Sequence, residues 1–190
     1  GRALQSKPLA QALRDVLTLR NLGGGGDGCN DRGERYSTAR RRFHHFMFYG
    51  FMLCFASTSV ATLYDHWGGL IAPYPFLSLP VQLGFWGGIG LLIGTTGLAW
   101  LKITGDAEPA APRVMGGDFA LLMLLALTSL TGLLLLGFRA TEAMGMLLAV
   151  HLGTVLTLFL FLPYSKMVHG VYRSLALLRA AIEQTPPART

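Results

Sequence analysis

The sequence predicts an all-α integral membrane protein, a bundle of four membrane-spanning helices, and three observations support this. First, 52% of the 190 residues are hydrophobic and only 14% are charged, whereas about a quarter of the residues in soluble domains are charged. Second, four apolar runs of about twenty residues follow one another along the chain. Third, the basic residues lie in short clusters beside those runs, as in proteins whose loops flank a membrane.

Residues 1–42 are predicted to form a cytoplasmic segment with one short helix and a glycine-rich loop. Apolar residues recur at helical spacing between Leu9 and Leu22, and the run Gly23–Gly28 ends that helix. The glycine run lacks the Gly-Lys-Ser/Thr ending of a nucleotide-binding loop, so we interpret it as a flexible tether or a docking loop for a soluble partner. A basic stretch, Arg35–Arg42, leads into the first apolar run.

The membrane domain is predicted to cover residues 43–179 and to be followed by a disordered tail, 180–190. About twenty helical residues, each rising about 1.5 Å, cross a hydrocarbon core of about 30 Å, and lipid leaves helices or closed barrels as the only spanning structures. Buried helices of a soluble protein are the alternative, and four consecutive runs of this length argue against it. The predicted spans are residues 43–64, 80–100, 118–138 and 144–162.

The distribution of basic residues predicts the orientation of these spans. With four spans, the N-terminal segment, the loop 102–117 and the C-terminal tail share one side of the membrane. That side carries fifteen of the sixteen Lys and Arg residues, and Arg139 is the exception. The positive-inside rule therefore places both termini in the cytoplasm. Aromatic residues near the span ends are typical of an interfacial belt: Trp67, Tyr74, Trp86 and Trp100.

Composition also excludes several functions. The net charge of +6 could suggest nucleic acid, but the basic residues flank spans rather than cover a polar face, so no nucleic-acid partner is expected. Cys29 and Cys54 form no Cys-x-x-Cys pair, which excludes an iron–sulfur cluster or a zinc ribbon held by this chain alone. The span interiors lack charged residues, which favours a bundle that holds a cofactor over an ion-coupled transporter.

The five histidines are the candidate functional residues, because ionisable side chains in or beside a span are costly unless they have a role. They are His44, His45, His66, His151 and His169. The last two are eighteen residues apart. On one continuous helix this spacing makes five whole turns and a rise of about 27 Å, so both imidazoles would lie on one face, one near each membrane surface.

This arrangement predicts a bundle of the haem-binding type, in which each iron takes one imidazole from each of two facing helices. His44 or His45 is at the right depth in the membrane to oppose His169. His66 could oppose His151, so all five histidines are candidate haem ligands. Two adjacent histidines cannot both bind one iron, so one of His44 and His45 would have a supporting role. His66 fits an interfacial polar residue equally well. Basic residues that could contact the haem propionates are Arg40, Arg41 and Arg42.

Several blocks of the sequence are distinctive rather than generic. They are LRNLGGGGDGCND, ARRRFHHFMFYGFMLCFASTSVATLYDH, APYPFLSLPVQLG, MGGDFALLMLLALTSLTGLLLL and an ending with HLG and PYSKMVHGVYR. On these blocks, between Leu9 and Arg179, the chain resembles the tricarballylate/citrate utilisation membrane protein family. More distantly, the spacing of His151 and His169 resembles the cytochrome b (gamma) subunit of respiratory nitrate reductases.

The resemblance implies an electron-transfer subunit in the inner (cytoplasmic) membrane of a bacterium rather than an independent enzyme. In that family, electrons from a cytoplasmic flavoprotein dehydrogenase acting on tricarballylate or citrate pass through iron–sulfur clusters and haem b to quinone. The resemblance implies one or two haems here, with His44 or His45, His151 and His169 as the ligand candidates.

The chain differs from the family pattern in lacking the cysteine-rich region that holds iron–sulfur clusters, and the spans that precede the glycine loop. Since it begins at Gly1 and not at Met, we interpret it as the C-terminal half of such a protein, or as a split subunit. The ligand opposite His151 is then either His66 or a residue on a missing N-terminal half or another membrane chain. A haem-free membrane anchor or scaffold subunit is the alternative function.

Overall fold

The computed structural model describes residues 6–19, 22, 29–32, 35–105 and 112–184. Within these ranges, four helices are long and apolar enough to cross a membrane. They are α2 (Ala39–His66), α3 (Leu79–Thr104), α4 (Pro112–Phe138) and α5 (Met144–Phe161). The prediction of four helices long and apolar enough to span a membrane is therefore confirmed, and the apolar runs lie inside the observed helices to within one residue.

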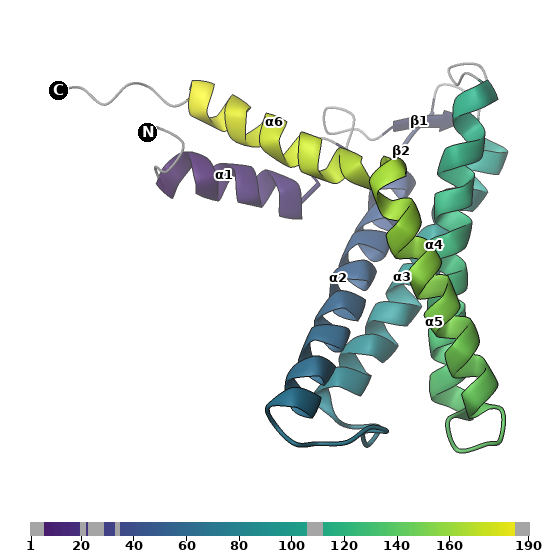
Figure 1. Cartoon of the computed structure of the whole chain (residues 1–190). Helices are drawn as coiled ribbons and strands as arrows, with labels where there is room; N and C mark the ends of the chain where they lie inside the picture. Colours follow the sequence, from purple (N-terminus) through teal and green to yellow (C-terminus); the bar gives the residue numbers. More distant parts are fainter. Residues whose placement is uncertain (1–5, 20–21, 23–28, 33–34, 106–111, 185–190) are drawn as a thin grey trace.

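Two further helices and a small hairpin lie at one end of the bundle (Figure 1). The helices are α1 (Ser6–Leu17) and α6 (His169–Gln184), which pack side by side at a steep angle to the spans. Strands β1 (Cys29–Arg32) and β2 (Arg35–Ser37) pair antiparallel, with Cys29 opposite Ser37. We call this end the basic end, because the Arg40–Arg42 run begins α2 there.

The hairpin departs from the sequence prediction, which had only a helix and a loop in residues 1–42. Strands of four and three residues are too short to show an alternating pattern of apolar and polar residues. The glycine run 23–28 lies outside the described residues, so the tether stays a prediction. Of the predicted tail 180–190, residues 180–184 form the end of α6 (His169–Gln184), and the rest lies outside the described residues.

Helices α2 and α3 pack at backbone distance because glycines line their contact. A Cβ atom on Gly50 or Gly94 would collide with the main chain of the facing helix, at Leu91 and Met47 respectively. A Cβ on Gly87 would lie 2.8 Å from the backbone nitrogen of Cys54. Small residues are what allow such contact between helices in lipid, where there is no hydrophobic force to pair them.

The remaining spans follow in chain order, with α4 against α3 and α5 against α4. The hydroxyl of Ser129 on α4 donates a buried 2.6 Å hydrogen bond to the carbonyl of Gly88 on α3. The core lies toward the basic end and is made by Leu91, Leu121, Leu125 and Leu158. Figure 1 shows the pair α2/α3 and the pair α4/α5 converging at the basic end and diverging toward the other.

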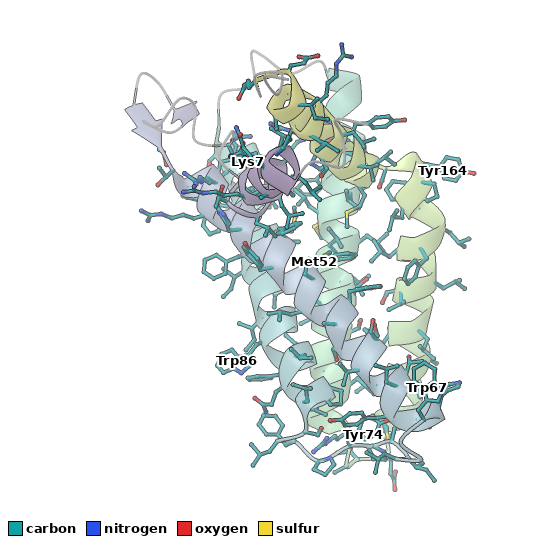
Figure 2. All side chains as sticks on the ribbon, turned by 90° about the vertical axis from the view of Figure 1, so that its left-hand side faces the viewer. Lys7, Met52, Trp67, Tyr74, Trp86 and Tyr164 are labelled. Atoms are coloured by element: carbon teal, nitrogen blue, oxygen red, sulfur yellow. The ribbon has the colours of Figure 1, made fainter. Side chains whose placement is uncertain are left out.

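Aromatic residues mark the two ends of the bundle in Figure 2. Trp67 and Tyr74 lie at the far end, whereas Tyr164 lies near the basic end, and Trp67 and Tyr164 are 83% and 87% exposed. At the far end, the guanidinium of Arg139 donates a 2.7 Å hydrogen bond to the carbonyl of Tyr74 and so ties the α2–α3 loop to α4. This placement is typical of the aromatic belts that meet lipid headgroups.

The fourth span does not continue into α6, and here the sequence interpretation was wrong. Two short 3-10 helices, η3 (Leu162–Tyr164) and η4 (Lys166–Val168), separate α5 from α6. Pro163 has no N–H to continue the helix, and the hydroxyl of Ser165 accepts a hydrogen bond from the backbone N–H of Met167 at 3.1 Å. His151 and His169 therefore do not share one helix face.

The close α2–α3 contact predicts a strong effect of adding one methyl group. Gly94→Ala is expected to lower the free energy of unfolding by about 1–3 kcal/mol, because the main chain of Met47 cannot move aside as a side chain would. The measurement is thermal unfolding of the detergent-solubilised protein.

The matched control is Gly145→Ala on α5, where a Cβ atom would meet nothing within 4 Å. This variant is expected to keep or slightly raise the unfolding temperature, since alanine favours helix over glycine. Equal unfolding temperatures for the two variants would contradict the close packing of α2 on α3.

Candidate functional site

His44 and His169 face each other where α2 meets the start of α6. Their ring centroids are 6.4 Å apart and the ring planes are nearly perpendicular, at 89°. His44 lies in the second turn of α2 and is half-buried, and His169 is the first residue of α6 and is exposed. The pairing that the sequence predicted between the start of the first span and His169 is present, although the break after α5 produces it rather than a continuous helix.

Each ring of this pair has one nitrogen that could bind a ligand. Nδ1 of His44 is buried and has no hydrogen-bond partner among the described residues, a state that costs about 1–3 kcal/mol unless a ligand satisfies it. Nδ1 of His169 lies against the carbonyl oxygen of Lys166. An Nδ1–H that donates to a backbone carbonyl leaves Nε2 with a free lone pair, the usual state of a metal-bound histidine.

These residues fit a haem iron better than a bare metal ion. The described residues contain no group of three or more His, Cys, Asp or Glu side chains able to hold a metal, whereas a structural zinc site needs four ligands. A haem iron needs only the two axial positions. If one metal ion bound a nitrogen of each ring at about 2.0–2.1 Å, the two ring centres would lie roughly 6 Å apart once half the width of each ring is added. This is close to the separation of the His44 and His169 rings.

His45 points into a different sector of α2 from His44. Its Nδ1 lies 3.0 Å from the carbonyl oxygen of Arg41, and its ring stacks on Tyr49 at 6.0 Å. The structure therefore brings His44, not His45, to His169. The guanidinium of Arg41 donates a 2.9 Å hydrogen bond to the carbonyl of Thr18, and Arg42 is exposed.

A cation that the sequence analysis missed also lies near the pair. Arg173 is four residues after His169 on α6, one turn along the same face. It is near enough to His44 to interact with it electrostatically. Arg173 could have been identified from the sequence, because a basic residue one helical turn from a candidate ligand is a natural partner for an anionic group.

His151 lies on the wall of a cavity of about 340 Å³ between the four spans. Its Nδ1 shares a 3.0 Å hydrogen bond with the hydroxyl of Thr131. The ring fits because residue 132 is glycine: a Cβ there would lie 3.0 Å from Cε1 of His151. The volume is at the lower end of the range for small-molecule pockets. The wall is mostly apolar, and its polar side chains are Cys54, Ser57, Thr58, Tyr74, Thr128, Ser129 and His151.

His66 does not oppose His151. It is exposed at the far end of α2, where its Nδ1 lies 3.2 Å from the carbonyl oxygen of Thr62, and it is not among the residues that line the cavity. The expectation that these two histidines face each other is therefore not met, and the interfacial interpretation of His66 agrees with its position.

A carboxylate at the basic end holds the break between α5 and α6 in place. Oδ2 of Asp118 on α4 accepts hydrogen bonds from Lys102 on α3 at 2.9 Å and from Lys166 on η4 at 2.7 Å. Met167, the next residue, packs against the leucine core. Asp118 thus fixes η4, whose carbonyl at Lys166 orients His169. Sequence analysis used Asp118 only to mark the start of a span, although a carboxylate between lysines on two other segments is a typical cross-link.

Comparison with known proteins identifies related sequences. The family model described as "Citrate utilization protein B" matches residues 2–190. A protein of that name from Escherichia coli is 52% identical over 177 residues, which are 93% of this chain and 47% of the relative. The chain therefore spans about half the length of the curated relative that it matches. No solved structure is significantly similar to it.

The Asp118 cross-link predicts that losing one charge loosens the segment before His169. Asp118→Asn leaves two lysines without a counter-ion, so hydrogen–deuterium exchange of residues 162–172 is expected to rise severalfold while that of α3 stays unchanged. Glu183→Gln is the matched control: it removes an exposed ion pair with Arg179, 2.8 Å long, within α6. An Asp118→Asn exchange pattern identical to that of Glu183→Gln would show that η4 does not need the carboxylate.

Proposed function

This chain belongs to the citrate utilization protein B family, and on that premise we propose that it is the haem-carrying membrane part of an electron-transfer system. In this proposal His44 and His169 are the axial ligands of one haem b. Electrons arrive from a flavoprotein dehydrogenase of tricarballylate or citrate utilisation through iron–sulfur clusters held elsewhere, and they leave to quinone in the membrane.

The facing imidazoles of His44 and His169 carry the proposal. A haem b bound there would supply a one-electron carrier held within the protein. The chain's own residues supply the rest: two ring nitrogens bind the iron, and the carbonyl of Lys166 fixes the orientation of one of them and raises its basicity. Arg173 adds positive charge beside the pair, where a propionate would lie.

The distribution of charge supports the direction of transfer. Arg40–Arg42, Arg173 and the lysines on Asp118 lie at one end of the bundle, and basic flanks face the cytoplasm. The haem would therefore lie on the side where a soluble donor reaches it, in the inner membrane of a bacterium. Basic residues also attract an acidic partner surface and speed its association.

The cavity beside His151 is the proposed exit for the electrons. Its wall suits the apolar body of a quinone. In the tautomer whose Nδ1 accepts from the Thr131 hydroxyl, Nε2–H of His151 would donate a hydrogen bond to a quinone carbonyl oxygen. Because no described histidine lies opposite His151, this chain alone would hold one haem. A second haem on His151 would need a ligand from another membrane chain or from the rest of a longer protein.

The first prediction concerns haem content. The purified protein, reduced with dithionite, is expected to show the sharp α-band of a six-coordinate b-type haem, and His44→Ala and His169→Ala are each expected to lose it. His66→Ala and His45→Ala are the controls that keep it. Monodisperse elution of each variant separates loss of the ligand from loss of the fold, and added imidazole should restore the band in His169→Gly.

A wild-type protein without this band would favour the haem-free membrane anchor instead. Loss of the band in His45→Ala, with its retention in His44→Ala, would reverse the ligand assignment.

A second prediction separates the cavity from the haem. His151→Ala is expected to keep one haem per chain but to slow re-oxidation of the reduced protein by a short-chain quinone analogue about tenfold, the effect of losing one hydrogen bond of about 1.4 kcal/mol. Re-oxidation is measured by stopped-flow absorption, with His66→Ala as the control. Halving of the haem content in His151→Ala would assign this residue as a ligand.

A further inference from the structure

Helix α1 has an apolar face that no described part of the chain covers. Leu9, Leu13 and Leu17 lie within about 80° of one another around the helix, and their side chains are 45%, 57% and 42% exposed. The opposite side is occupied: Pro8 and Ala12 are buried where α1 packs on α6, and Gln11 forms a 3.4 Å hydrogen bond with Gln184. The leucine row is therefore available to a partner.

Two hydrogen bonds fix the depth of this face. The hydroxyl of Tyr49 donates to the carbonyl of Leu17 at 2.8 Å, and the guanidinium of Arg41 donates to the carbonyl of Thr18 at 2.9 Å. Tyr49 lies about 12 Å further along α2 than Arg41, inside the first apolar span. The end of α1 is therefore held where the polar start of α2 gives way to its lipid-facing part.

The orientation of α1 suits a helix that lies in the plane of a membrane. In Figures 1 and 2, α1 runs across the basic end of the bundle. It lies on the side of α6 that faces the far end. The exposed leucines thus lie at an end of the bundle where α2 also exposes apolar side chains, Phe46 at 49% and Met52 at 41%. A soluble partner that covered the leucine row would have to enter the depth that lipid occupies.

The charges on α1 indicate which lipid surface it meets. Lys7 and Arg14 are exposed and flank the leucine row: each lies about 100° or more around the helix from Leu9 and Leu13, and about 60–80° from Leu17. Apolar residues on one face and basic residues beside them are typical of interfacial helices on anionic membranes. Arg42 and Arg173 are exposed at the same end.

We propose that α1 is an in-plane anchor that inserts Leu9, Leu13 and Leu17 into the boundary between headgroups and acyl chains and binds anionic phospholipid headgroups through Lys7 and Arg14. The anchor carries α6 on its other face, so the lipid surface supports the helix on which His169 lies. This role does not depend on haem and is independent of the proposed electron transfer.

The test places a fluorescent label on each face of α1 in the full chain. In a Cys29→Ser, Cys54→Ala background, Leu13→Cys and Arg14→Cys are labelled and reconstituted in vesicles of phosphatidylcholine with phosphatidylglycerol. The label at position 13 is expected to be quenched by lipids with a spin label on the upper part of the acyl chain and to be protected from aqueous iodide. The label at position 14 is expected to show the opposite pattern.

Equal iodide quenching at the two positions would overturn the proposal and would indicate a face left for a soluble protein. A second measurement needs no label: the wild type is expected to retain more phosphatidylglycerol through detergent purification than the Lys7→Gln, Arg14→Gln double variant. Equal retention would remove the headgroup part of the proposal. An Arg139→Gln variant, at the far end of the bundle, controls for general loss of charge.

Discussion

The contact between α2 and α3 determines where the candidate ligands lie. Gly50, Gly87 and Gly94 let the two backbones meet, and a closely packed pair of helices has only one rotational setting in which the glycines face each other. That setting turns His44 toward α6, whereas His45 lies on another side of α2, stacked on Tyr49 of the same helix. In lipid, van der Waals contact of this kind replaces the hydrophobic force that packs helices in water. The direction in which the His44 imidazole points therefore depends on glycines, which have no side chains, at the contact between α2 and α3.

Those features of the fold that the bilayer imposes were predictable from the sequence. A hydrocarbon core favours long apolar helices, so the four candidate spans follow from hydropathy. The orientation expected from the arginine-rich N-terminal segment follows from the cost of moving cations across that core. The break after Phe161 was not predicted, because the residues around Pro163 keep helical apolar spacing while the geometry changes. The hairpin of Cys29–Ser37 was missed because its strands are too short for a periodic signal.

The candidate site was predictable as a set of residue types but not as a set of contacts. Histidine is rare in spans, so the five candidates could be identified from the sequence, and the pairing of the first span with His169 was expected. Choosing His44 over His45, separating His66 from His151, and finding Asp118 and Thr131 all require distances across helices far apart in sequence. Such contacts depend on helix rotation, which hydropathy does not encode.

The position of His169 as the first residue of α6 has a mechanical consequence. Helix α6 is sixteen residues long, a rigid arm of about 24 Å whose pivot is held by Asp118 and the leucine core. A displacement of a few ångström at its far end, where Gln184 meets Gln11 of α1, would turn the imidazole through several degrees and barely translate it. A protein that docks on the outer part of α6 would therefore twist the ring about its pivot without pulling it away from His44. The arm would convert contact at a distance into a rotation of the His169 ring.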